Sequence, residues 1–192
     1  KDAEETLVMM EEEVKAIRQG LKELRESEER NSLQVQQALD VYEELKKNLR
    51  EEGATYGPAY AELQKQVKNI EIEFTQFVTL NTSGDPVEAR EVLEEAEKHT
   101  YELQDLMKRI PVVYQELNKT FPAQLKEIED GYKKLLEEKF KFPEENFEND
   151  IHRVARRIEN STADLAKVEV AAVEVANRDT AHEIDTLYTV ME

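Results

Sequence analysis

The chain has no cysteine and no tryptophan, and it contains only five glycines and five prolines. The absence of cysteine excludes disulfide bonds, thiolate zinc sites and cysteine nucleophiles, and it is typical of a reducing compartment. No apolar run approaches the roughly 20 residues that a membrane span requires. So few helix breakers, with 36% charged and only 7% aromatic residues, indicate long helices packed along a thin core.

Acidic residues outnumber basic ones, and the formal net charge is −18. A surface of this sign repels phosphate backbones and anionic lipid headgroups, so we expect neither nucleic acid nor a membrane surface to bind this segment directly. Two interpretations of the acidity stay open. It attracts a basic patch on a partner protein, or it only keeps an elongated molecule in solution.

Between Leu7 and Leu49, apolar residues recur every three or four positions. Two polar residues, Glu28 and Asn31, interrupt this stripe, which then continues in the same register. The spacing predicts one helix of about 45 residues and about 70 Å, at about 1.5 Å per residue. The stripe consists of Leu7, Met10, Val14, Ile17, Leu21, Leu24, Val35, Ala38, Tyr42, Leu45 and Leu49.

Two turns follow, at residues 53–58 and 83–86. Pro58 and Pro86 suit the first turn of a helix, and Asp85 is placed to cap the second of these helices. The helix between the turns carries Tyr60, Leu63, Val67, Ile70, Phe74 and Phe77 in its stripe; the next carries Ala89, Val92, Ala96, His99, Leu103, Leu106 and Ile110. Short turns predict antiparallel neighbours, so these pieces should form a three-helix bundle.

Residues 111–139 continue the third helix with a kink. Its stripe shifts register at Pro122, which predicts a short break near Thr120, and Gly131 indicates close helix packing. We expect a third turn at residues 141–143 and a fourth at residues 177–180, before a last segment with Ile184, Leu187 and Met191. The helix between these two turns carries Phe147, Ile151, Val154, Ile158, Leu165, Val168, Ala172 and Val175, with one interruption at Ser161.

The predicted fold is all-α: elongated tandem antiparallel three-helix bundles of the spectrin-like kind, joined by shared long helices. Residues 1–27 are half of a helix from a preceding repeat, residues 28–110 form the first bundle, and residues 111–192 form a second, incomplete bundle. Leu106→Asp should strongly destabilise the first bundle, because it places a charge in the predicted core.

No constellation for catalysis is present in the sequence. Bundle metal sites use Glu-x-x-His motifs, but Ala96, Asn149 and Asp179 precede His99, His152 and His182 by three residues. Phosphate-loop and nucleophile-elbow motifs are absent. We therefore expect no enzyme activity and no catalytic, cofactor-binding or metal site. His99 is expected to be a core or rim histidine that is hydrogen-bonded to a neighbouring side chain.

Arg153, Arg156 and Arg157 form the one compact basic cluster of the sequence. Two interpretations stay open: an acidic partner binds there, or Arg156 and Arg157 pair within their own helix with Asp150, Glu159 or Asn160.

Four short motifs, in order and at characteristic spacing, resemble the septation ring formation regulator EzrA family. They are Gly84–Arg90, Met107–Pro111, Phe121–Leu125 and Asp130–Tyr132, and the likeness extends from about residue 15 to the end. One departure is Lys139-Phe140, where many relatives have a Gly-Tyr pair, and we expect it to alter only the local turn.

The resemblance implies an N-terminal membrane anchor upstream of a cytoplasmic rod of spectrin-like repeats, at the division septum. It also implies binding to the tubulin-like protein FtsZ and to other division or cell-wall synthesis proteins, with negative regulation of Z-ring assembly. The anchor and the family's C-terminal Gln-Asn-Arg patch are expected outside this segment, and no partner-binding residue is carried over. The alternative is a spectrin-like spacer or coiled-coil adaptor with no partner site here.

Overall fold

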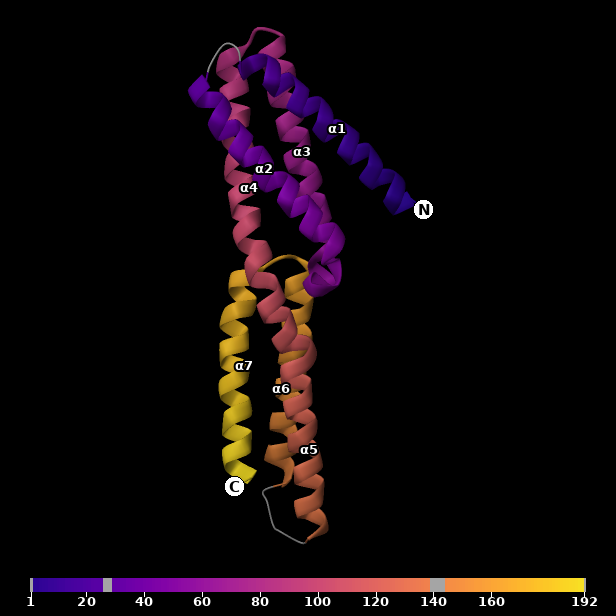
Figure 1. Cartoon of the computed structure of the whole chain (residues 1–192). Coiled ribbons are helices and arrows are strands. Elements are labelled where there is room, and N and C mark those ends of the chain that lie inside the picture. The colour runs from indigo at the N-terminus through magenta and orange to yellow at the C-terminus, as the bar shows by residue number, and fades with distance from the viewer. Residues whose placement is uncertain (1, 26–28, 139–143, 192) are drawn as a thin grey trace. The chain divides into compact units, whose positions relative to one another are not determined.

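The computed structural model describes residues 2–25, 29–138 and 144–191, and within these ranges every regular element is helical. The predicted all-α class is therefore confirmed for the described part of the chain. Figure 1 shows the elements, which are α1 (Asp2–Arg25), α2 (Glu29–Glu51), η1 (Gly53–Ala59), α3 (Tyr60–Thr82), α4 (Pro86–Gln115), η2 (Glu116–Thr120), α5 (Phe121–Glu137), α6 (Glu144–Ala166) and α7 (Val170–Met191).

The helices form two compact units. Unit 1 comprises residues 1–51 and 63–105, and unit 2 comprises residues 52–62 and 106–192. Unit 1 thus holds α1, α2, most of α3 and the first part of α4, while unit 2 holds the remainder.

In unit 1, α1 returns along α2, so the prediction of one continuous helix is wrong. Arg18 of α1 contacts Asp40 at 2.6 Å and pairs with Glu43 of α2, and Arg50 lies 2.7 Å from Glu11. In one straight helix, positions 11 and 50 would be about 58 Å apart. The prediction was wrong because the apolar stripe keeps the same register whether the chain continues as one helix or folds back into two. The predicted interruption at Glu28 lies outside the described residues.

The predicted stripes of the first two helical regions form the core of unit 1. Tyr42 of α2 packs on Phe74 of α3 with ring centroids 5.8 Å apart. Tyr60 is only half-buried. The buried stripe residues are Met10, Val14, Ile17, Val35, Ala38, Tyr42, Leu45, Leu49, Leu63, Val67, Ile70, Phe74 and Phe77.

The stripe predicted for α4 is partly wrong. Val92, His99 and Leu106 are half-buried, whereas the residues that follow them, Leu93, Thr100 and Met107, are buried. In each pair of neighbouring residues, both side chains are apolar or able to lie in a core. A spacing of three and four residues therefore does not decide which of the two is buried. Thr100 enters the core because its hydroxyl donates to the Ala96 carbonyl at 2.7 Å.

The turn predicted at residues 83–86 is confirmed. Gly84 has φ 88°, and the N–H of Asp85 donates to the Leu80 carbonyl at 3.0 Å, which closes the end of α3. The Asp85 carboxylate then accepts the N–H of Glu88 at 3.3 Å and caps α4.

The turn predicted at residues 53–58 is also confirmed and belongs to unit 2. Gly57 has φ 56°, and a Cβ there would overlap the ring of Tyr114. Only glycine fits both the backbone angle and this close approach.

Further along unit 2, the break predicted near Thr120 is confirmed as a short π-helix. The N–H of Phe121 donates to the Glu116 carbonyl, five residues earlier, and this wider turn absorbs the register shift. The close packing predicted at Gly131 is confirmed as well, because a Cβ there would overlap Cε of Met191. The turn predicted at residues 141–143 lies outside the described residues.

Helices α5, α6 and α7 pack side by side in unit 2 (Figure 1). Tyr132 of α5 contacts Phe147 of α6 with ring centroids 4.9 Å apart. Asn177 of α7 donates to the Val113 carbonyl at 3.3 Å, and Glu174 pairs with Arg109. The last turns of α4 are thereby joined to α7.

The turn between α6 and α7 lies at residues 167–169, so the prediction of a turn at 177–180 is wrong. Val168 adopts φ 62°, and the N–H of Glu169 donates to the Asp164 carbonyl at 3.1 Å. Asn177 and Thr180 are buried inside α7, whereas the predicted core residues Ala172 and Val175 are exposed. The sequence Asn-Arg-Asp-Thr suggested a capped turn, but two of its polar residues face the core.

Candidate functional site

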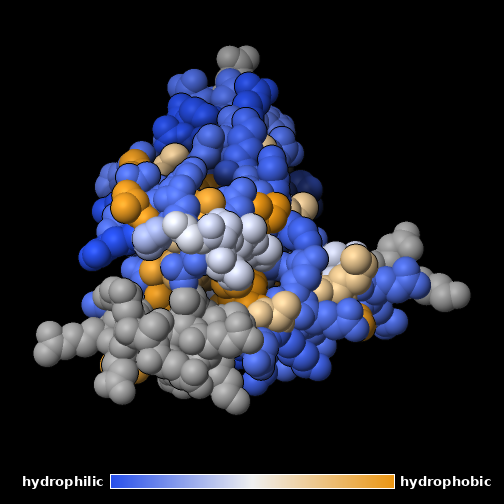
Figure 2. Space-filling model, turned by 90° about the horizontal axis from the view of Figure 1, so that it is seen from above, coloured by the Kyte–Doolittle hydropathy of each residue, from blue (hydrophilic) through white to orange (hydrophobic). Residues whose placement is uncertain are grey.

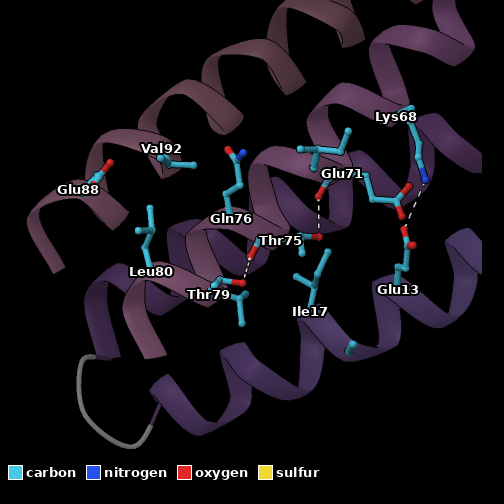
Figure 3. Close-up of a pocket in the computed structure, with 13 residues that line it drawn as sticks. Glu13, Ile17, Lys68, Glu71, Thr75, Gln76, Thr79, Leu80, Glu88 and Val92 are labelled. Carbon is cyan, nitrogen blue, oxygen red and sulfur yellow. Dashed lines mark hydrogen bonds and ion pairs between the residues drawn. The ribbon is translucent and has the colours of Figure 1, made fainter. Parts of the chain in front are cut away.

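A groove in unit 1, bordered by α1, α3 and α4, is the candidate site (Figure 3). Its volume is about 640 Å³, within the range of natural ligand pockets. From Lys68 to Leu80 the lining extends about 18 Å along α3, at 1.5 Å per residue. The lining residues are Glu13, Ala16, Ile17, Lys68, Glu71, Ile72, Thr75, Gln76, Val78, Thr79, Leu80, Glu88 and Val92.

The groove face of α3 is more apolar than its sequence suggests. Ile72 keeps 46% of its surface exposed. The hydroxyls of Thr75 and Thr79 donate to the carbonyls of Glu71 and Thr75, at 2.9 and 3.0 Å. Both hydroxyl protons are therefore used within α3, and the two threonines offer no free donor to the groove. Figure 3 shows both bonds beside the labelled lining residues.

One carboxylate in the lining is almost fully buried. Glu71 is 1% exposed, and its Oε2 accepts a hydrogen bond of 3.2 Å from the Tyr42 hydroxyl. Burial raises the pKa of Tyr42, with a further contribution from the Glu13 and Glu43 carboxylates, so this hydroxyl remains a donor. Glu71 Oε1 has no hydrogen-bond partner among the described residues. A buried carboxylate with one oxygen unsatisfied destabilises the fold unless a further donor binds that oxygen.

A second buried charge lies in the same unit. Lys46 of α2 is 8% exposed, and its Nζ has no hydrogen-bond partner among the described residues. Burial lowers its pKa. The rim of the groove is better satisfied, because Lys68 Nζ lies 3.6 Å from Glu13 of α1.

Sequence reasoning missed Glu71, although a signal was present. Glu71 follows Val67 by four residues and precedes Phe74 by three, so it shares the buried face of α3. The stripe predicted for this helix contains apolar residues only, so it passes over Glu71.

The predicted rim histidine is confirmed. His99 Nδ1 lies 2.7 Å from Glu73 of α3, and Nε2 lies 3.5 Å from Glu95. The three histidines are not brought together into a site: His152 is exposed on α6 and lies 3.9 Å from Glu148, and His182 is exposed on α7. Within the described ranges, no group of three His, Cys, Asp or Glu side chains could hold a metal ion.

The basic cluster of α6 pairs differently from the prediction. Arg157 lies 3.3 Å from Glu183 of α7, instead of a residue in its own helix. Arg153 pairs within α6, at 3.2 Å from Asp150, and also lies 3.9 Å from Glu183. These contacts join α6 to α7, so they account for part of the cluster structurally.

Comparison with known proteins identifies the family. The model of the family described as "Septation ring formation regulator, EzrA" matches residues 1–192. The chain belongs to the EzrA family. The resemblance found in its sequence motifs is thereby confirmed.

Two EzrA relatives are similar along nearly the whole chain. The septation ring formation regulator EzrA of Enterococcus faecalis is 69% identical over 191 residues, covering 100% of this chain and 33% of the relative. EzrA of Streptococcus suis is 42% identical over 182 residues, covering 95% of this chain and 32% of the relative. The chain therefore spans about a third of the length of these EzrA proteins. No solved structure matches it.

EzrA proteins carry the name of a septation ring regulator, which places this chain in a family of cell-division proteins. Among the described helices, none is long and apolar enough to cross a membrane. Figure 2 shows hydrophilic side chains over most of the face in view, with hydrophobic ones scattered among them.

Proposed function

We propose that this chain is a segment of a scaffold that binds FtsZ and negatively regulates assembly of the septation ring. The scaffold lies on the cytoplasmic side of the bacterial membrane, tethered by an N-terminal anchor outside this segment. It acts through contacts with FtsZ and with other division or cell-wall synthesis proteins, and it catalyses no reaction. The observation that carries the proposal is the match of the EzrA family model to residues 1–192.

The architecture proposed with it is a tandem of antiparallel three-helix, spectrin-like bundles joined by long helices. In this arrangement residues 28–110 and 111–192 form two successive bundles, and α1 packs on α2 in unit 1. What supports it is the helix α4, which contributes residues to both compact units. Long paired helices present extended surfaces, which suit binding to a polymer better than they suit chemistry.

Sedimentation of FtsZ polymers with and without the 192-residue chain tests the function. We expect the chain to sediment with FtsZ and to lower the mass of pelleted polymer. The complete cytoplasmic part of the same protein is the positive control. If that control lowers the polymer mass while this chain neither sediments nor changes it, the binding function lies elsewhere.

A second function, that of a spacer without a partner site, is favoured by one observation. The chain spans only about a third of its EzrA relatives, so two thirds of their length lies outside it. In that case, replacing this segment by a helical spacer of equal length should leave regulation of FtsZ by the complete protein intact. Loss of regulation would contradict the spacer function.

A further inference from the structure

The groove of α1, α3 and α4 has an apolar lining and an acidic charge, which together suit the binding of a helix. Its α3 side presents Ile72 together with Thr75 and Thr79, whose hydroxyls donate within the helix, and these residues recur at the spacing of one helix face. Ile17 of α1 and Val92 of α4 line the opposing sides. Grooves of this kind bind the apolar face of an amphipathic helix through side chains at positions i, i+3, i+4 and i+7.

The charge of the groove determines what kind of helix fits. Glu71 is 1% exposed and lines the groove, and its Oε1 has no hydrogen-bond partner among the described residues. Figure 3 shows it between the labelled Lys68 and Thr75 side chains on α3. Among the described lining residues, Glu13 and Glu88 add carboxylates and Lys68 is the one cation. Because Oε1 is itself buried, a lysine or arginine side chain supplies the missing bond once the groove side chains around it move aside.

We propose that this groove is a docking site for a basic amphipathic helix of a partner protein, which places an apolar face on Ile72 and a cationic side chain on Glu71. A second copy of the chain is a poor occupant, because it brings another −18 of net charge. Nucleic acid is disfavoured for the same reason. The proposal concerns a site, and it stands whether or not FtsZ is the partner.

Fluorescence anisotropy with a defined probe tests the proposal. The probe is a labelled 18-residue peptide of leucine and lysine, with leucine at every third and fourth position. A peptide of the same composition in scrambled order has the same charge but no apolar face. We expect the 192-residue chain to bind the patterned peptide at least about ten-fold more tightly at physiological salt.

Matched variants separate the groove from the general acidity of the chain. Glu71→Gln and Glu159→Gln each remove one negative charge, but Glu159 is exposed on α6 of unit 2 and is not a lining residue of the groove. Ile72→Ser and Val175→Ser each remove an exposed apolar side chain, and Val175 lies on α7. We expect Glu71→Gln and Ile72→Ser to raise the Kd about ten-fold or more, and the two controls to leave it nearly unchanged.

Three results would overturn the proposal. Equal weakening by Glu71→Gln and Glu159→Gln, or equal affinity for both peptides, means that only overall charge attracts the probe. Self-association of the chain that Ile72→Ser abolishes assigns the groove to a second copy. If Glu71→Gln alters the melting curve of the chain, Ile72→Ser decides the matter, because Ile72 is exposed and its replacement leaves the core intact.

Discussion

A proline at position 179 distinguishes a continuous α7 from a turn at residues 177–180. Asp179 is exposed and lies in the interior of the helix Val170–Met191. In Asp179→Pro, the helix loses one backbone hydrogen bond and the ring clashes with the carbonyl of the preceding turn. This combination costs about 3 kcal/mol or more in a helix interior.

Ala171→Pro is the matched control. Ala171 is also exposed, but it lies in the first turn of α7, where backbone N–H groups have no partner within the helix. A proline there should cost much less. If the chain instead turned at residues 177–180, position 171 would be a helix interior and the order of the two effects would reverse.

Urea unfolding followed by far-UV circular dichroism measures the difference. With a slope of about 1–3 kcal/mol per M, a loss of 3 kcal/mol lowers the midpoint by about 1–3 M for Asp179→Pro. Amide hydrogen exchange within α7 gives a local measure of the same loss. A larger loss for Ala171→Pro than for Asp179→Pro would refute the helix boundaries described for α6 and α7.

Three further predictions concern the core and the turns. Met107→Ala should lower the free energy of unfolding by about 2–5 kcal/mol, because Met107 is 4% exposed, and more than Leu106→Ala does; the reverse order in urea unfolding would contradict the register of α4. Gly84→Ala should cost about 1–2 kcal/mol through its φ of 88° alone, since a Cβ there meets nothing within 4 Å; an unchanged melting curve would exclude this strain. Lys46→Met should stabilise the chain at pH 7 by on the order of 1 kcal/mol or more. Burial lowers the Lys46 pKa in the folded chain, so the free-energy cost of its buried charge is full below that folded-state pKa and shrinks as the pH rises towards 10.5. The stabilisation by Lys46→Met should shrink over the same range. A stabilisation that grew with pH would contradict the burial of the ammonium group.

Two helix ends show why the sequence predicts some turns and not others. Gly84 and Val168 both adopt positive φ, and both helices close with the same pair of backbone hydrogen bonds. Gly84 is followed by a capping aspartate and a proline, so the local sequence predicts this turn. Val168 is a β-branched residue in a conformation that such residues rarely adopt. It is 9% exposed, and its packing in the core, which a single sequence does not reveal, holds it there.

The candidate site was less predictable than the helices. Helix periodicity located the buried stripes of α2 and α3, since apolar spacing depends only on local geometry. The groove depends on α1 folding back, which is a contact between residues far apart in the sequence. Glu71 has the right spacing for burial, but a charged side chain favours the surface, and the Tyr42 hydroxyl that donates to it at 3.2 Å comes from another helix.

The groove depends most on the return of α1 along α2, because α1 forms one of its walls. The chain has no cysteine, so Glu12→Cys and Lys47→Cys introduce two unique, exposed sites for spin labels. A continuous helix would separate these positions by about 52 Å, at 1.5 Å per residue. Pulsed electron paramagnetic resonance should give a main distance below half of that value, as the contact between Glu11 and Arg50 requires. A main distance near 52 Å would contradict the return of α1 along α2.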